Sequence, residues 1–171
     1  FQTTRLFEAL LEDERPAYIR VGRNPVEDVY TESCPFQMDR ATVVREGTDA
    51  LLVACGEMVR PAIVAADLLA ADGVSATVLD MYCVKPLDRE AIVTYTRDAK
   101  VVVGVEEHAP FGGLGSMVAQ VVGEECPRPC VTMALPDAPV ITGSSREVFA
   151  QYDLDAHGIA TRVRELLAKG G

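Results

Sequence analysis

The feature that most constrains the fold is the run from Val101 to Val105, in which four of the five residues are valine. A strand that faces water on one side alternates apolar and polar residues, so this run predicts a strand covered on both faces. Glu106, Glu107 and His108 follow it, and a glycine turn then opens a sequence with helical spacing. In parallel sheets, ligands and partners usually meet the loops at the carboxyl ends of the strands, so this stretch is also the first place to look for function.

Strands and helices are predicted to alternate along the chain. The expected strands are residues 41–46, 50–55, 75–82, 100–105 and 130–135. The expected helices are residues 59–71, 89–96, 114–125, 144–152 and 155–168, with Asp88 as an N-cap and Ser144 with Glu147 as a capping box. This pattern predicts an α/β fold, a three-layer α/β/α sandwich around a mixed, mostly parallel five-stranded sheet. The short turn at residues 47–49 is hairpin-like, so the first strand is expected to be antiparallel to the others.

The first 40 residues differ from the rest. Residues 4–12 have helical spacing, residues 17–21 (AYIRV) are predicted to form a strand, and residues 26–38 are polar and interrupted by prolines. One helix and one strand cannot bury an apolar face alone. We therefore expect residues 1–24 to be the tail of another domain, residues 25–40 to be a linker, and residues 41–171 to form the domain described above.

Charge and cysteine content narrow the class of protein. The net charge of −10 disfavours nucleic acid and anionic membranes as partners, because both require clustered Lys and Arg. The sequence has five cysteines, no C-x-x-C pair and only two histidines, so no metal site is expected. Since no apolar stretch reaches membrane length and the cysteine count is odd, a cytoplasmic location is expected.

Four segments resemble, in order, the C-terminal domain of the transketolase family. They are YIRVGR (residues 18–23), VACGEMV (53–59), LDMYCVKPLD (79–88) and VEEHAPFGGLGS (105–116). The family also includes deoxyxylulose-phosphate synthases and the beta subunits of 2-oxo-acid dehydrogenases. The segments are most similar to bacterial and archaeal transketolases that are split into two subunits.

The resemblance implies an enzyme that transfers a two-carbon ketol unit between sugar phosphates. In this family a pyrimidine-binding and a diphosphate-binding domain hold thiamine diphosphate and Mg, and residues 1–24 resemble the end of the former. The Gly-Asp-Gly motif of the latter is absent from this sequence. The chain alone is therefore expected to be inactive and to bind neither cofactor nor metal. Its partners would be the remaining domains or subunit, in a homodimer or heterotetramer. A non-catalytic interaction or regulatory module is the alternative.

Among possible site residues, the resemblance favours Arg23 as a ligand of the sugar phosphate, with Arg20 as the alternate. A guanidinium can grip a phosphate with two parallel donors. Glu106, Glu107 and His108 have the residue types of a general acid–base cluster, but the resemblance favours a role in orienting the loop or in an interface. No catalytic residue is expected in this chain.

The glycine turn that follows these residues has two interpretations. Gly112, Gly113 and Gly115 could form a phosphate cradle at a helix N-terminus. The same glycines could instead form a tight turn that lets the following helix pack closely on the sheet. The G-G-x-G string matches neither the P-loop nor the dinucleotide-binding pattern, so the tight turn is the preferred interpretation.

Overall fold

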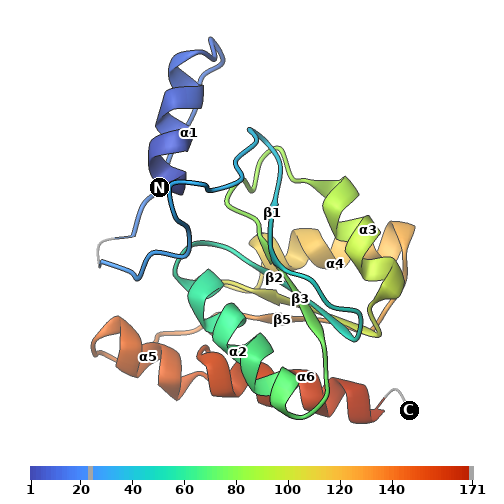
Figure 1. Cartoon of the computed structure of the whole chain (residues 1–171). Helices are drawn as coiled ribbons and strands as arrows, with labels where there is room; N and C mark the ends of the chain where they lie inside the picture. Colours follow the sequence, from blue (N-terminus) through green and yellow to red (C-terminus); the bar gives the residue numbers. More distant parts are fainter. Residues whose placement is uncertain (23–24, 170–171) are drawn as a thin grey trace.

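The computed structural model of the chain describes residues 1–22 and 25–169, and within them one sheet of five strands forms the centre of the fold (Figure 1). The strands are β1 (Thr42–Arg45), β2 (Ala50–Ala54), β3 (Ala76–Asp80), β4 (Val101–Val105) and β5 (Cys130–Met133). Their order in the sheet is β1-β3-β2-β4-β5. The strands β2 to β5 are parallel and β1 is antiparallel, which confirms the predicted fold class.

The place of β1 corrects one detail of that prediction. β1 pairs with β3 and not with β2, so the turn at residues 47–49 does not form a hairpin. Instead the turn crosses the start of β3, where the backbone N–H of Gly47 donates to Thr77 Oγ1 at 2.9 Å. A Cβ on Gly47 would lie 2.5 Å from the backbone N of Ala76. A residue with no side chain is therefore needed for this crossing.

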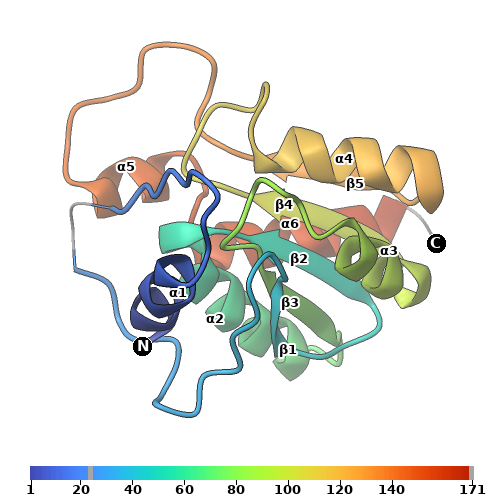
Figure 2. The ribbon, with the colours of Figure 1, turned by 90° about the horizontal axis from the view of Figure 1, so that it is seen from above.

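Helices cover both faces of the sheet (Figures 1 and 2). A 3₁₀ turn (Gly56–Met58) leads into α2 (Val59–Ala71), which packs with α6 (Ala156–Lys169) on one face. α3 (Arg89–Asp98) and α4 (Leu114–Glu125) cover the other face, and α5 (Ser145–Gln151) precedes α6. Asp88 caps α3 and the Ser144–Glu147 capping box begins α5, as predicted. Within the described ranges, no helix is long and apolar enough to cross a membrane.

The core confirms that the central strands are covered on both faces. All five residues of β2, of β3 and of β4 are buried. Leu52 and Val103 belong to the apolar cluster on the α2 and α6 side, whereas Leu51 and Val102 belong to the cluster under α3 and α4. Successive residues of a strand point to opposite faces, so an unbroken apolar run serves both clusters.

The N-terminal residues lie outside this core. α1 (Gln2–Leu11) has no buried residue and stands away from the sheet in Figure 1. The strand predicted at residues 17–21 is wrong: that segment forms neither helix nor strand, and no described segment pairs with it in a ladder. A strand exists only beside a neighbouring backbone. The open edges of this sheet are the outer sides of β1 and β5, and residues 17–21 pair with neither. Residues 25–41 contain neither helix nor strand.

Candidate functional site

The carboxyl ends of β2, β3 and β4 bring several polar residues to one edge of the sheet. Glu57 follows β2, Asp80 ends β3, and Glu106 begins the loop after β4. The chain passes from β3 to β4 across β2, so the direction of winding changes between β2 and β4. Ligands of open α/β sheets bind at such a change, which makes this edge, here called the carboxyl edge, the candidate site.

Glu106 is engaged with the first turn of α4. Glu106 is only 1% exposed. Its two carboxylate oxygens accept hydrogen bonds from the backbone N–H groups of Leu114 and Gly115, both at 2.8 Å. The free N–H groups at a helix N-terminus attract anions, and a carboxylate there is favoured by the helix dipole. The anion at this helix N-terminus is therefore the chain's own glutamate.

The glycines of the turn each have a structural reason. A Cβ on Gly113 would collide with the Glu106 carboxylate, and one on Gly115 would collide with the side chain of Thr132. Gly112 has a φ of 77°, which favours glycine. This geometry supports the interpretation of a tight turn, because a bound phosphate would have to displace Glu106.

Glu107 and His108 lie beside Arg20, which comes from the N-terminal segment. Arg20 Nη1 is in hydrogen-bond contact with His108 Nε2, and Arg20 Nη2 lies 3.9 Å from Glu107 Oε1. Burial raises the pKa of the Glu107 carboxyl, and the charge of Glu57 raises that pKa further, whereas Arg20 lowers it. The structure thus brings together three of the residues singled out from the sequence, although Arg20 is 88 positions from His108.

Arg23 lies outside the described residues, so its prediction stays untested. Gly22, the last described residue before it, lies close to Glu57, which follows β2. A Cβ on Gly22 would be 2.8 Å from Glu57 Oε1. The segment that leads to Arg23 therefore runs along the carboxyl edge.

Asp80 is a member of this edge that sequence reasoning missed. Its residue is 3% exposed, and its Oδ2 accepts hydrogen bonds from Gln2 Nε2 at 2.9 Å and from Tyr30 OH at 2.6 Å. Burial raises the pKa of Asp80, although the bonds from Tyr30 and Gln2 lower it, and burial also raises the pKa of Tyr30. The sequence contained one signal of this role, because Asp80 is an acidic residue at the end of an apolar strand. Its hydrogen-bond donors could not be predicted, because Gln2 and Tyr30 lie 78 and 50 positions away in the sequence.

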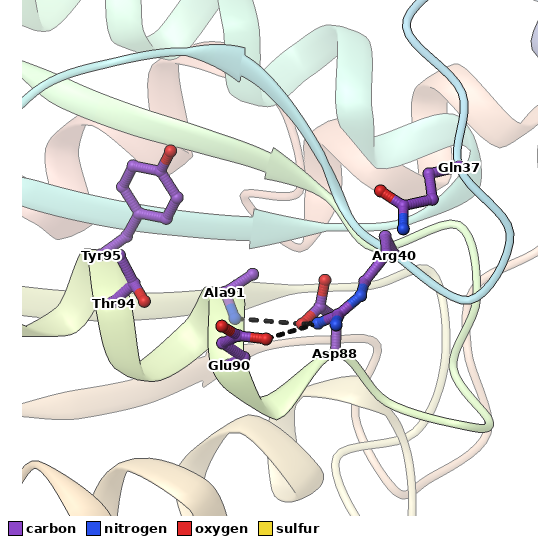
Figure 3. Close-up of a pocket in the computed structure, with 7 residues that line it drawn as sticks. All are labelled: Gln37, Arg40, Asp88, Glu90, Ala91, Thr94 and Tyr95. Atoms are coloured by element: carbon purple, nitrogen blue, oxygen red, sulfur yellow. Dashed lines mark hydrogen bonds and ion pairs between the residues drawn. The ribbon is translucent and has the colours of Figure 1, made fainter.

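Two surface pockets are lined by none of these side chains. One, of about 360 Å³, is lined by residues that include Gln37, Thr94 and Tyr95 (Figure 3). Inside it Arg40 Nη1 donates to Asp88 Oδ1 at 3.3 Å and to Glu90 Oε2 at 2.8 Å, so its charged groups satisfy one another. The other, of about 530 Å³, lies between the end of β5 and α6. Across residues 1–22 and 25–169, no group of three or more His, Cys, Asp or Glu side chains could hold a metal ion.

Known proteins are similar to this chain in sequence and in fold. Residues 39–159 match the family model for the transketolase C-terminal domain. The chain is 39% identical over 169 residues to one subunit of the apulose-4-phosphate transketolase of Phocaeicola vulgatus, covering 98% of this chain and 54% of that protein. It is also 36% identical over 137 residues to the 1-deoxy-D-xylulose-5-phosphate synthase of Syntrophotalea carbinolica, covering 80% of this chain and 21% of that enzyme.

A solved structure agrees with these sequence matches. A split-gene transketolase described as an inactive beta4 tetramer superposes with a TM-score of 0.85 and 38% identity, covering 95% of this chain and 53% of that one. The chain thus spans about half the length of the first transketolase subunit it matches. Since the family model covers most of the chain, and the chain is 39% identical to a transketolase subunit, the chain belongs to the transketolase family and contains its C-terminal domain.

Proposed function

We propose that this chain is the C-terminal portion of a thiamine-diphosphate-dependent transketolase, which transfers a two-carbon ketol unit between sugar phosphates. In this proposal the chain itself is not catalytic and serves domain packing and subunit assembly in the cytoplasm. The observation that carries the proposal is the pairing along the carboxyl edge. The groups that would meet a ligand there, Glu106, Glu107, His108 and Asp80, are bound to the chain's own residues.

The similar proteins support this division of labour. The Phocaeicola vulgatus relative is a transketolase subunit, and this chain matches about half of it. The similar solved structure is a split-gene transketolase described as an inactive tetramer. Both are consistent with an enzyme of several subunits in which residues 1–24 end a pyrimidine-binding domain, residues 25–40 link it onward, and residues 41–171 form the C-terminal domain. The other partners would be the pyrimidine- and diphosphate-binding parts, in a homodimer or heterotetramer.

The cofactor itself does not fit the glycine turn at the start of α4. A diphosphate with Mg needs free N–H groups and several oxygen ligands for the ion. Glu106 already occupies the N–H groups of Leu114 and Gly115, and its charge would repel a diphosphate. Thiamine diphosphate and Mg therefore belong, in this proposal, to the other domains of the enzyme. Arg23 remains our candidate for the phosphate of the sugar, since the described side chain of Arg20 is engaged with His108.

Calorimetry with and without the other parts of the enzyme tests the proposal. We expect no heat of binding when thiamine diphosphate and Mg are titrated into this chain alone. Heat of binding and ketol transfer between sugar phosphates are expected once the complementary domains or subunit are added. Tight binding by the chain alone, or a reconstituted enzyme that binds the cofactor without ketol transfer, would contradict the proposal.

A second candidate function is favoured by one specific match. The similarity to a 1-deoxy-D-xylulose-5-phosphate synthase covers 80% of this chain. The 2-oxo-acid dehydrogenase beta subunits remain a further alternative on the resemblance of the motifs. The reconstituted enzyme decides between them. Formation of 1-deoxy-D-xylulose 5-phosphate without ketol transfer between sugar phosphates would favour the synthase.

A further inference from the structure

We propose that Asp80 is a positioning residue that fixes two parts of the N-terminal region, α1 and residues 25–41, on the C-terminal domain. The proposal rests on the proposed function, in which α1 belongs to the end of a pyrimidine-binding domain. Asp80 then determines how that domain sits against this one in the assembled enzyme, without touching the reacting atoms. One buried side chain thus couples the arrangement of two domains.

The first step is that two distant parts of the chain use the same acceptor atom. Asp80 ends β3, which lies between β1 and β2 in the sheet, and the residue is 3% exposed. Its Oδ2 accepts hydrogen bonds from Gln2 Nε2 at 2.9 Å and from Tyr30 OH at 2.6 Å. Gln2 is the first residue of α1, whereas Tyr30 belongs to the segment that leads into β1. Loss of this one oxygen therefore removes both bonds.

The second step is that α1 depends on such a contact for its direction. The helix has ten residues and buries none of them. Isolated helices shorter than about 12–15 residues are marginal in water. Figure 1 shows the start of α1 beside the domain and the rest of the helix pointing away from it. The bond from Gln2 to Asp80 ties this first turn to the end of β3 and so limits the directions in which α1 can point.

The third step is that residues 25–41 are docked on the domain, although they contain neither helix nor strand. Tyr30 is partly buried, and its neighbour Val29 packs against the apolar cluster on the α2 and α6 side. Farther along, the rings of Phe36 and Tyr82 have centroids 5.3 Å apart. Side-chain contacts therefore set the path of this segment. The bond made by Tyr30 is the contact that connects the path to α1.

Substitutions separate the acceptor oxygen of Asp80 from its charge. Asp80→Ala removes the oxygen that both donors use. Asp80→Asn keeps one oxygen, which can take the position of Oδ2 and accept both bonds. Burial disfavours the charged form and raises the pKa of Asp80, so loss of the charge alone should not release either donor.

Chymotrypsin cleavage measures the docking of residues 25–41 on the chain itself. The protease must take the ring at position 30 into its own pocket, so the bond to Asp80 protects the peptide bond after Tyr30. Because proteolysis tracks the population of the open form, we expect Asp80→Ala to speed this cleavage about tenfold relative to cleavage after Tyr18, which is 89% exposed. Tyr30→Phe, which chymotrypsin also cleaves, should give a similar increase. Asp80→Asn should restore most of the protection.

Trypsin cleavage after Arg5 measures the docking of α1, because a helix must open locally before it is cut. We expect Asp80→Ala and Gln2→Met each to speed this cleavage about fivefold, since both remove the bond that holds the first turn. Tyr30→Phe removes only the other donor and should change it by less than about twofold. If Asp80→Ala leaves cleavage after Arg5 unchanged, Asp80 does not orient α1.

Asp49→Ala is the matched control for a general loss of stability. Asp49 precedes β2, at the opposite ends of the strands from Asp80, and its carboxylate binds Ser75 and Lys100. The variant should leave the ratio of cleavage after Tyr30 to cleavage after Tyr18 unchanged. A rise in this ratio as large as that of Asp80→Ala would refute the positioning role, as would an unchanged ratio in Asp80→Ala.

Kinetics of the assembled enzyme measure the consequence for the arrangement of the domains. We expect Asp80→Ala to raise about tenfold the concentration of the complementary domains or subunit needed for half-maximal ketol transfer, because a loosened region must be ordered again on assembly. At saturation kcat should stay within about twofold of the wild type. Asp80→Asn should behave like the wild type.

The measurements on the chain and on the enzyme separate the failure of each proposal. An unchanged half-maximal concentration in Asp80→Ala would overturn the role in domain arrangement, even in an active transketolase. If the assembled wild-type enzyme has no ketol transfer with any donor, the proposed function is wrong. The cleavage ratios of the chain alone then still decide whether Asp80 docks the N-terminal region.

Discussion

The domain from Thr42 to Lys169 and the residues before it are held in place by different forces. In the domain, every residue of the three central strands is buried between two layers of helices. In the N-terminal part, α1 buries none of its residues, and Leu11 is 86% exposed. Its described contacts with the domain include the polar ones made by Gln2 and Arg20. The difference teaches that extensive apolar burial stabilises the domain, whereas hydrogen bonds, ion pairs and a few apolar contacts, such as that of Val29 with the core, hold the residues before it.

The largest expected effect comes from the domain core. Leu52→Ala in β2 removes a side chain that is 0% exposed, so we expect a loss of about 2–5 kcal/mol in the free energy of unfolding. Leu11→Ala in α1 should change it by less than about 0.5 kcal/mol, because the side chain is exposed. Urea denaturation of the chain measures both. Equal losses would show that α1 is part of the core in solution, and the comparison would fail.

A smaller loss of stability is expected for substitutions of Glu106, which follows β4 and binds the first turn of α4. Glu106→Ala leaves the N–H groups of Leu114 and Gly115 without acceptors in a buried place, which should cost about 2–3 kcal/mol. Glu106→Gln keeps one acceptor oxygen and should cost less. The free energy of unfolding of both variants tests this order. If the glutamine variant is as destabilised as the alanine variant, the negative charge matters more than the hydrogen bonds.

The smallest expected effect is a change of stability with pH at Asp80, which binds Gln2 and Tyr30 from the N-terminal part. Burial raises the pKa of Asp80 above its ordinary value of 3.8. The unfolded chain therefore releases this proton first as the pH rises, so the stability contributed by Asp80 is complete below pH 3.8 and is lost as the pH rises through the folded-state pKa. Unfolding measured from acid to neutral pH should show this decline in the wild type and lack it in Asp80→Asn.

Asp49 provides the matched control inside the domain. Its hydrogen bonds to Lys100 and to the backbone of Ser75 lower its pKa. The pH dependence therefore has the opposite sign to that of Asp80. The stability that Asp49 contributes is present above the ordinary pKa of 3.8 and is lost as the pH falls through the folded-state pKa. Asp49→Asn should remove part of the acid sensitivity and leave the decline caused by Asp80. The same change in both variants would refute the assignment of opposite signs.

Most of the domain could be predicted from local sequence. The valine run of β4, the N-cap Asp88 and the Ser144–Glu147 capping box depend on residues within a few positions of one another, and the structure has each of them. The helix after the glycines was predicted with the bounds that α4 has, Leu114–Glu125. Such features are set by backbone geometry and by short-range hydrogen bonds, which the order of residues largely determines.

The candidate site was only partly predictable. Glu106 and His108 could be predicted as candidate site residues from their residue types after a buried strand. The residues that they contact could not be predicted. His108 meets Arg20 from 88 positions earlier, and Asp80 meets Gln2 from 78 positions earlier. The hairpin interpretation and the strand at residues 17–21 failed for a related reason. Strand pairing depends on which backbone lies alongside, and local propensity carries no information about that.

The sequence by itself therefore determined an α/β sandwich with buried parallel strands, because residue period and helix caps act over a few residues. It also carried the four motifs that identify the transketolase family. Only the tertiary structure decided the order β1-β3-β2-β4-β5 and the pairing at the carboxyl edge. There Glu106 satisfies α4, and His108 and Asp80 bind the N-terminal segment. The physical reason is that these contacts join residues far apart in the chain, which meet only after the sheet has formed.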